Sequence, residues 1–230
     1  MSEISLATLR IGIIEDEGIT RDLLAAICER EFAATVVLRA AAGREGLAGV
    51  LAQRPELLLL DLCLPDLDGL TVAASVRRDL PHCRVIVLSA LRDPVTLMRI
   101  RELGLHGFVD KREQSLAVLR HAIGSILEGR GYFSPVMAAV LADLRRDPYA
   151  FHLVLSPHEQ RILVHIGNSR TDDEIAAVTG LRPATVQSRR RDIMRKLNIH
   201  STPKLIHYAN AMGFSRLGKY LPPAGETAAG

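Results

Sequence analysis

The chain has few of the residues that mark secreted, zinc-bound or membrane-spanning proteins. Its 230 residues include no tryptophan and three scattered cysteines, Cys28, Cys63 and Cys83. An odd number of cysteines cannot form a complete disulfide framework, and their spacing does not match zinc ligands, which fits a reduced cytosol. No apolar run approaches the roughly 18–20 residues that a transmembrane helix needs, and no secretory signal is evident at the N-terminus. We therefore expect a cytoplasmic protein without membrane association.

Length and charge indicate two domains with different partners. The chain is longer than a typical single domain, and 48% of its residues are hydrophobic, enough for two cores. Residues 156–220 contain 11 Lys or Arg against 5 Asp or Glu, a net charge of +6, whereas the remainder carries −3. This asymmetry predicts that only the C-terminal part meets a polyanion.

Short apolar stretches alternate with helical patterns in the first half of the chain. The expected strands are Leu9–Ile14, Thr35–Leu38, the leucine run 57–60 that ends in Asp61, Val85–Leu88 and Gly107–Lys111. The expected helices are 19–27, Arg44–Gln53, Leu67–Leu80, Val95–Leu103 and Leu116–Leu127. This alternation predicts an α/β doubly wound, five-stranded parallel sheet with helices on both faces.

The leucine run is the central strand, and it ends in a carboxylate. Pro65 and Asp68-Gly69 force the backbone to turn after it. Asp61 is therefore expected at the carboxyl edge of the sheet, where open α/β sheets bind their ligands. By itself, Asp61 is equally compatible with a helix N-cap or a turn.

Four further polar residues are expected at the same edge, because they follow the other strands: Glu15, Asp16, Ser89 and Lys111. Three crowded carboxylates repel one another unless a divalent cation such as Mg²⁺ lies among them. A carboxylate nucleophile, a metal, a lysine and a hydroxyl suit phosphoryl transfer. Each residue alone could be an ordinary surface group, but the coincidence of all five favours a site.

The second half of the chain is expected to be helical and to follow a linker. Residues 130–153 form this linker, with one helix at Val136–Leu144, and residues 217–230 are expected to be a flexible tail. Between them, Ser156 with Glu159 and Thr171 with Glu174 have the spacing of helix-capping boxes. A turn at Gly180, a basic helix at Pro183–Leu197 and a last helix from Pro203 complete a helix-turn-helix pattern.

The basic helix has an apolar side and a polar side. At 100° per residue, Val186, Ile193 and Leu197 fall on one face and predict its contact with the core. The opposite face carries Gln187, Ser188, Arg191 and Arg195. Arg190 lies near the core face, so its stem is expected to pack while its charged head reaches solvent. Arginine and glutamine can read bases in the major groove, although a merely solvated basic helix has the same composition.

Residues 10–129 resemble the receiver domain of two-component response regulators. The resemblance is carried by Glu15-Asp16, Asp61 with Pro65 and Asp68-Gly69, Ser89-Ala90, and Gly107-Phe108 ahead of Lys111. It implies a flavodoxin-like receiver domain over residues 8–129, in which Asp61 accepts a phosphoryl group from a sensor histidine kinase.

The same resemblance implies the roles of the surrounding residues. Asp16, Asp61 and the backbone carbonyl of Cys63 would bind Mg²⁺, with Glu15 helping through water. Ser89 and Lys111 would contact the phosphoryl oxygens, and Phe108 would be a switch aromatic, although it could equally be a core residue.

The chain departs from the family pattern around the lysine. Asp110 precedes Lys111 and Arg112 follows it, where many members have proline or aspartate. Asp110 is expected to pair with Lys111 in the resting state. The thiol of Cys63 is interpreted as a small apolar side chain and not as a redox sensor.

Residues 155–214 resemble the LuxR-type helix-turn-helix domain. We therefore expect a DNA-binding domain over residues 154–216. The match runs through Leu155–Glu159, Asp173–Ala176, Thr185-Val186 and Arg195–Leu197. The resemblance implies base contacts by Gln187, Ser188 and Arg191. It implies phosphate contacts by Thr185, Arg189 and Lys196, and the outward face adds Arg195. It also implies dimerisation through the last helix, with Leu205, Ile206 and Ala209.

These observations predict a DNA-binding transcriptional response regulator of a two-component system. Its expected partners are a sensor histidine kinase, double-stranded DNA and, on activation, a second copy of the chain. No enzyme activity is expected beyond phosphorylation and dephosphorylation of Asp61. One alternative is a DNA-binding regulator whose receiver is not switched by phosphorylation. Another is an aspartate-nucleophile phosphatase, which usually needs a second aspartate where this chain has Cys63.

Overall fold

The computed structural model describes residues 9–113 and 115–217. Nearly all of the expected tail, 217–230, lies outside these residues. The chain divides into two compact units, one of residues up to 92 with 97–138 and the other of 93–96 with residues from 139 onward. Within the described residues, no helix has the length and apolar character needed to cross a lipid bilayer.

The first unit is built on a parallel sheet with the order β2-β1-β3-β4-β5-β6. Its main strands are β1 (Arg10–Ile14), β2 (Thr35–Ala40), β3 (Leu57–Asp61), β4 (Arg84–Ser89) and β5 (Gly107–Asp110). All five residues of β3 are buried, as expected for a strand covered on both faces. The predicted strands are therefore confirmed to within two residues at each end.

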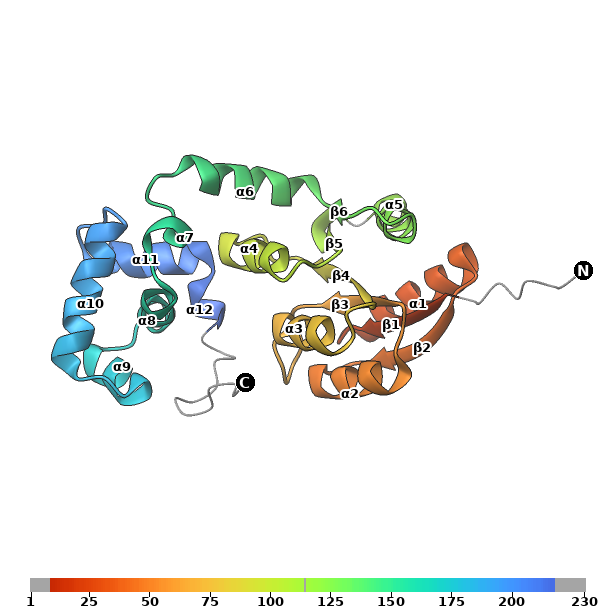
Figure 1. The fold of residues 1–230 in the computed structure, drawn as a ribbon, viewed down its shortest axis with the longest axis horizontal. Coiled ribbons are helices and arrows are strands. Elements are labelled where there is room, and N and C mark those ends of the chain that lie inside the picture. Colours follow the sequence, from red (N-terminus) through yellow and green to blue (C-terminus); the bar gives the residue numbers. More distant parts are fainter. Residues whose placement is uncertain (1–8, 114, 218–230) are drawn as a thin grey trace, which may run out of the picture. The chain divides into compact units, whose positions relative to one another are not determined.

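Helices cover both faces of this sheet (Figure 1). They are α1 (Gly18–Phe32), α2 (Gly43–Gln53), α3 (Gly69–Asp79), α4 (Pro94–Glu102) and α5 (Leu116–Leu127). Alternate strand residues such as Ile13, Leu59 and Ile86 pack with α1 and α5 in one core. On the opposite face, α2 packs against β1 and β2, and α3 against β3. The predicted alternation of strands and helices is confirmed.

A sixth strand corrects the expectation of five. Tyr132–Phe133 forms β6, which pairs in parallel with β5 at the edge of the sheet. Two residues are too few to show the alternation that identifies a strand in a sequence. The neighbouring glycines, Gly129 and Gly131, are typical of a linker. The sequence therefore predicts a linker at residues 130–153 where the structure has a strand.

The expected linker, residues 130–153, is more structured than predicted, and the boundary between the two units falls inside it, after Ala138. Two helices, α6 (Pro135–Arg146) and α7 (Phe151–Val154), follow β6 in this segment. Outside it, the 3-10 turn η1 (Lys111–Glu113) lies between β5 and α5. The segment at 130–153 therefore holds a strand and two helices where one helix was expected.

The second unit consists of short helices. After α7 it contains α8 (Pro157–Gly167), α9 (Asp172–Thr179), α10 (Pro183–Lys196), α11 (Thr202–Met212) and α12 (Phe214–Leu217). Its core includes an edge-to-face pair of Phe151 and Phe214, with ring centres 5.0 Å apart. The predicted helix-turn-helix arrangement of α9 and α10 is present.

Capping explains where α8 and α9 begin. The hydroxyls of Ser156 and Thr171 accept hydrogen bonds from the amides of Glu159 and Glu174, and both glutamates bond back to the cap residues. These reciprocal bonds satisfy amides that a helix leaves unpaired at its N-terminus. Gly180 ends α9 with a φ of 71°, a left-handed conformation that glycine adopts without strain.

The close approach of Gly69 to the backbone after β3 can be tested by substitution. A Cβ at this position would lie 2.5 Å from the carbonyl oxygen of Asp61 and from the Cα of Leu62. We expect Gly69→Ala to lower the free energy of unfolding by roughly 1–3 kcal/mol, as overpacking does. The measurement is urea unfolding of the full chain followed by circular dichroism.

The matched control is Gly124→Ala in α5, because a Cβ there meets nothing within 4 Å. Alanine is favoured over glycine inside a helix, so this variant should be as stable as the parent or slightly more stable. Equal stability of the two variants would contradict the close approach at Gly69.

Candidate functional sites

The carboxyl ends of the central strands meet at one edge of the sheet. Asp61 ends β3, Ser89 ends β4 and Asp110 ends β5, while Glu15 follows the last residue of β1. The register pairs Asp61 with Leu88 and Ser89 with Asp110, so these ends are level with one another. The edge therefore collects polar side chains that lie far apart in the sequence.

Lys111 lies between two of these carboxylates. Its Nζ is 2.8 Å from Oδ2 of Asp61 and 2.8 Å from Oε1 of Glu15. Glu15 and Asp61 are almost fully buried, with 1% and 4% of their surface exposed. The ammonium group thus neutralises two acids that would otherwise repel each other in a region of low dielectric constant.

Burial and nearby charges shift the pKa values of Glu15 and Lys111. Burial raises the pKa of Glu15, the hydrogen bond from Lys111 lowers it, and the nearby charge of Asp61 raises it, with a net increase. Burial acts to lower the pKa of Lys111, but its hydrogen bonds to Asp61 and Glu15 outweigh burial and raise it. The lysine therefore stays charged at neutral pH.

The acidic group fits a divalent cation. Glu15, Asp16 and Asp61 each offer a carboxylate oxygen, and these oxygens all lie within 4.8 Å of one another. Oε2 of Glu15 is buried and has no hydrogen-bond partner, although Nζ of Lys111 lies 2.7 Å away without the alignment of a hydrogen bond. Oxygen donors with spare lone pairs are the ligands that Mg²⁺ takes.

The other residues assigned from the family resemblance lie around this group. The amide of Cys63 donates to Oδ1 of Asp61 at 3.1 Å and fixes the orientation of that carboxylate. Ser89 is fully buried, and its Oγ accepts a hydrogen bond from the amide of Leu91 at 3.2 Å. Phe108 is also fully buried, so the structure has this aromatic packed inside the domain.

The expected pairing of Asp110 with Lys111 is wrong. Asp110 is buried and forms an ion pair with Arg92, whose Nε lies 2.6 Å from Oδ2. Its carboxylate is thus held by Arg92 and by the amide of Arg112, and Lys111 instead contacts Glu15 and Asp61. Arg92 was missed by the sequence analysis, because no local pattern links it to a residue 18 positions away.

The second candidate site is the exposed side of α10. Val186, Ile193 and Leu197 are buried, as the helical spacing predicts. Most of the expected DNA contacts are exposed, namely Gln187, Ser188, Arg189, Arg191 and Arg195, and Thr185 is partly exposed. The side of α10 opposite its buried face presents Gln187 and Ser188 together with Arg191 and Arg195, and Arg189 is exposed beside the buried face.

Two cations of α10 are bound within the domain. Nζ of Lys196 lies 2.8 Å from both carboxylate oxygens of Glu159, so its ammonium is already paired with an acid. Its expected phosphate contact stays a prediction. The guanidinium of Arg190 donates two hydrogen bonds to Oδ1 of Asp172, at 2.9 and 2.7 Å. The expectation that this charged head reaches solvent is wrong, because the side chain is only 12% exposed. Both partners belong to the first turn of another helix, where acidic residues are favoured.

The expected dimer contacts on α11 need a correction. Leu205 and Ala209 are fully buried and belong to the core of their own domain, where α11 packs against α8. Residues four apart share one face of a helix, and here that face points inward. Ile206 alone among the three expected residues is partly exposed.

Comparison with protein families matches both units. Residues 11–124 match the response regulator receiver domain, and residues 153–209 match the bacterial regulatory proteins of the luxR family. The chain is a DNA-binding response regulator. The receiver match contains the acidic edge of the sheet, and the luxR match contains α10.

Individual relatives agree with this family assignment. The response regulator protein VraR of Staphylococcus aureus is 22% identical over 202 residues, which are 88% of this chain and 96% of that protein. A structure of RcsB from Salmonella enterica serovar Typhimurium has a TM-score of 0.63 at 22% identity and covers 89% of this chain and 98% of RcsB. A LuxR-family response regulator from Aurantimonas has a TM-score of 0.55 at 28% identity and covers 61% of this chain and all of its own length.

Lys196→Met tests whether this lysine is structural in the response regulator. Burial acts to raise the pKa of Glu159, but the hydrogen bonds from Lys196 and Ser156 outweigh it and lower the pKa. A carboxyl group whose pKa is lower in the folded state stabilises the fold at a pH above its usual range. This stabilisation is lost as the pH falls and the carboxylate takes up a proton. We expect the variant to lose roughly 1–3 kcal/mol at neutral pH, and the loss to shrink in acid. Thermal unfolding between pH 3 and pH 7 measures this, with the pH range set by the carboxyl pKa.

Arg195→Met is the control, since it removes one charge from the same turn of α10. Arg195 pairs with Asp192 at 2.9 Å, but its side chain is 76% exposed, and such surface pairs contribute little. Equal losses in the two variants would show that the contact between Lys196 and Glu159 is not structural.

Proposed function

We propose that Asp61 is the phosphoacceptor of this response regulator and that a sensor histidine kinase is the donor. The observation that supports this most is the position of Lys111, whose ammonium lies 2.8 Å from Asp61 in a group of three carboxylates. This arrangement supplies a nucleophile and positive charge in one place, which phosphoryl transfer requires.

The reaction can be followed through the residues of the chain. One oxygen of Asp61 attacks phosphorus, a P–O bond forms, and the P–N bond to the histidine of the kinase breaks. The departing imidazole keeps the electron pair of that bond. The ammonium of Lys111 can then exchange its contact with the carboxylate for the phosphoryl oxygens, and the Ser89 hydroxyl is a second donor for them. Water later cleaves the acyl phosphate and regenerates Asp61.

Glu15, Asp16, Asp61 and the backbone carbonyl of Cys63 would hold Mg²⁺. A bound cation would supply positive charge that neutralises the phosphoryl oxygens as the transfer proceeds. The carboxylates of this chain hold and orient that charge. The buried Oε2 of Glu15, which has no hydrogen-bond partner, supports this assignment.

The C-terminal domain would bind double-stranded DNA through α10. Gln187, Ser188 and Arg191 are the proposed base contacts, and Thr185, Arg189 and Arg195 the proposed phosphate contacts. Two copies would bind together on activation, as RcsB dimers do in a structure with two parallel DNAs. A DNA-binding function supports the proposal that the chain acts in the cytoplasm.

Asp61→Asn tests the phosphoacceptor. We expect the parent to take up one phosphoryl group from a small donor such as acetyl phosphate when Mg²⁺ is present, and the variant to take up none. The amide lacks the nucleophilic oxygen charge that the reaction needs. Phosphate-affinity gel electrophoresis and mass spectrometry of the intact chain measure the uptake.

Asp66→Asn is the control on the same loop. The two carboxylate oxygens of Asp66 accept bonds from the amides of Gly43 and Arg44 at the start of α2. Asparagine keeps one of these two acceptors and, like Asp61→Asn, removes one charge from the loop. Uptake should stay at the level of the parent. Phosphoryl uptake that persists in Asp61→Asn would move the proposed site elsewhere.

Arg191→Ala tests the base contacts of α10. Loss of a bidentate arginine contact to guanine costs about 1–3 kcal/mol, or roughly 5- to 150-fold in affinity. We expect a loss in this range on a site selected from random DNA, with little change on unrelated duplexes. Arg30→Ala, an exposed change on α1, is the control. An equal loss on selected and unrelated DNA would show that Arg191 contacts phosphate instead.

A further inference from the structure

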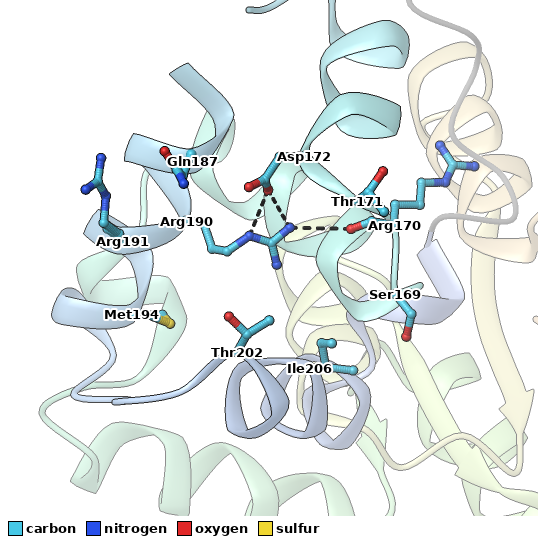
Figure 2. A pocket seen from close by; sticks show the side chains of 10 residues that line it. All are labelled: Ser169, Arg170, Thr171, Asp172, Gln187, Arg190, Arg191, Met194, Thr202 and Ile206. Carbon is cyan, nitrogen blue, oxygen red and sulfur yellow. Dashed lines mark hydrogen bonds and ion pairs between the residues drawn. The ribbon is translucent and has the colours of Figure 1, made fainter. Parts of the chain in front are cut away.

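A hollow in the second unit lies beside the proposed DNA-binding surface. It has a volume of about 460 Å³ and is formed by the start of α9, one side of α10 and the start of α11 (Figure 2). Gln187 and Arg191, two proposed base contacts, lie on its wall. A change in the charges of this hollow therefore acts where DNA is expected to bind.

Arg190 lies in this hollow and is held there. Its guanidinium makes two bonds to Oδ1 of Asp172, at 2.9 and 2.7 Å, and a longer one to the carbonyl oxygen of Arg170 at 3.4 Å. The side chain of Arg190 is 12% exposed and that of Asp172 is 30% exposed. The pair is largely shielded from water, so salt screens it less than a surface pair.

The neighbours of Arg190 have a different environment. Residues 189–191 are three consecutive arginines, and both Arg189 and Arg191 are exposed. Figure 2 shows the side chain of Arg191 directed away from Asp172, while that of Arg190 points toward it. One cation of the run is thus paired by an acid from another helix, and two remain available to a polyanion.

This difference has a measurable consequence for DNA binding. Each cation that neutralises a phosphate releases condensed counterions and makes the fall of log K with log salt steeper by about 0.9. That contribution does not depend on the base sequence. A cation that is already paired with a carboxylate makes no such contribution.

We propose that Asp172, at the start of α9, withholds Arg190 of α10 from DNA phosphates and is therefore a specificity-determining residue of the domain. It limits the sequence-independent part of the affinity and leaves the base contacts unchanged. This inference rests on the proposed DNA binding by α10. The alternative is that the pair only fixes α9 against α10, in which case its loss would weaken binding without changing the salt dependence.

The test is the salt dependence of binding of the full-length chain to a duplex of unrelated sequence. Fluorescence anisotropy is measured with the parent, Asp172→Ala and Asp173→Ala between 50 and 200 mM salt. Alanine removes both the charge and the Oδ1 acceptor that holds Arg190. Asp173 is the matched control because it is exposed, lies in the same turn of α9 and loses the same charge. We expect the slope for Asp172→Ala to be steeper by about 0.9, which is about a 3.5-fold larger loss of affinity over this range.

A double variant separates release of Arg190 from a general change of charge. Asp172→Ala with Arg190→Gln should return the slope to that of the parent, and Asp172→Glu, which keeps the charge, should leave it unchanged. Equal slopes for Asp172→Ala and Asp173→Ala would overturn the proposal, as would a steep slope that persists in the double variant. If the parent itself binds no duplex at 50 mM salt, the proposed DNA binding has failed instead. Circular dichroism checks that every variant is folded.

Discussion

The contact of Lys111 with Asp61 and Glu15 is the interaction on which the receiver domain depends. Two buried carboxylates at the end of a parallel sheet repel each other, and a single ammonium group between them offsets this repulsion. The contact also joins the ends of β1, β3 and β5, which are distant in the sequence. If Asp61 is phosphorylated as proposed, the phosphoryl group would have to displace Lys111 from the carboxylate, which would couple the proposed chemistry to the position of Lys111.

The ion pair between Arg92 and Asp110 links the loop after β4 to the end of β5. Arg92 lies three residues after Ser89, and Asp110 directly precedes Lys111. Asp110 is 1% exposed, and its amide also bonds the hydroxyl of Ser134 at 3.1 Å. Leaving this carboxylate unpaired in the interior would be costly. The loop after β4 and the end of β5 are therefore constrained to move together.

Features that depend on residues close together in the sequence could be predicted from it. Features that depend on the packing of distant segments could not. Strand and helix periodicity, the capping boxes at Ser156 and Thr171, and the inward face of α10 depend on residues a few positions apart. The pairs formed by Arg92, Arg190 and Lys196 join residues 18 to 37 positions apart, and no pattern in the sequence identifies them. Strand β6 was missed because two residues show no period. Leu205 and Ala209 were assigned to a dimer contact from the family resemblance, without regard to the face of α11 on which they lie.

Formal charge therefore overstates what α10 can offer to DNA. The helix has five Lys or Arg between residues 189 and 196, but Arg190 and Lys196 are paired with acids at the first turns of α9 and α8. These two pairs hold the recognition helix against the helices before it. The three remaining arginines, 189, 191 and 195, all lie on its exposed surface. Arginine thus fixes the helix to α9 at residue 190 and is exposed to solvent at residues 189, 191 and 195. Burial of the pair separates these roles, because Arg195 also has an acidic partner, Asp192, but stays exposed.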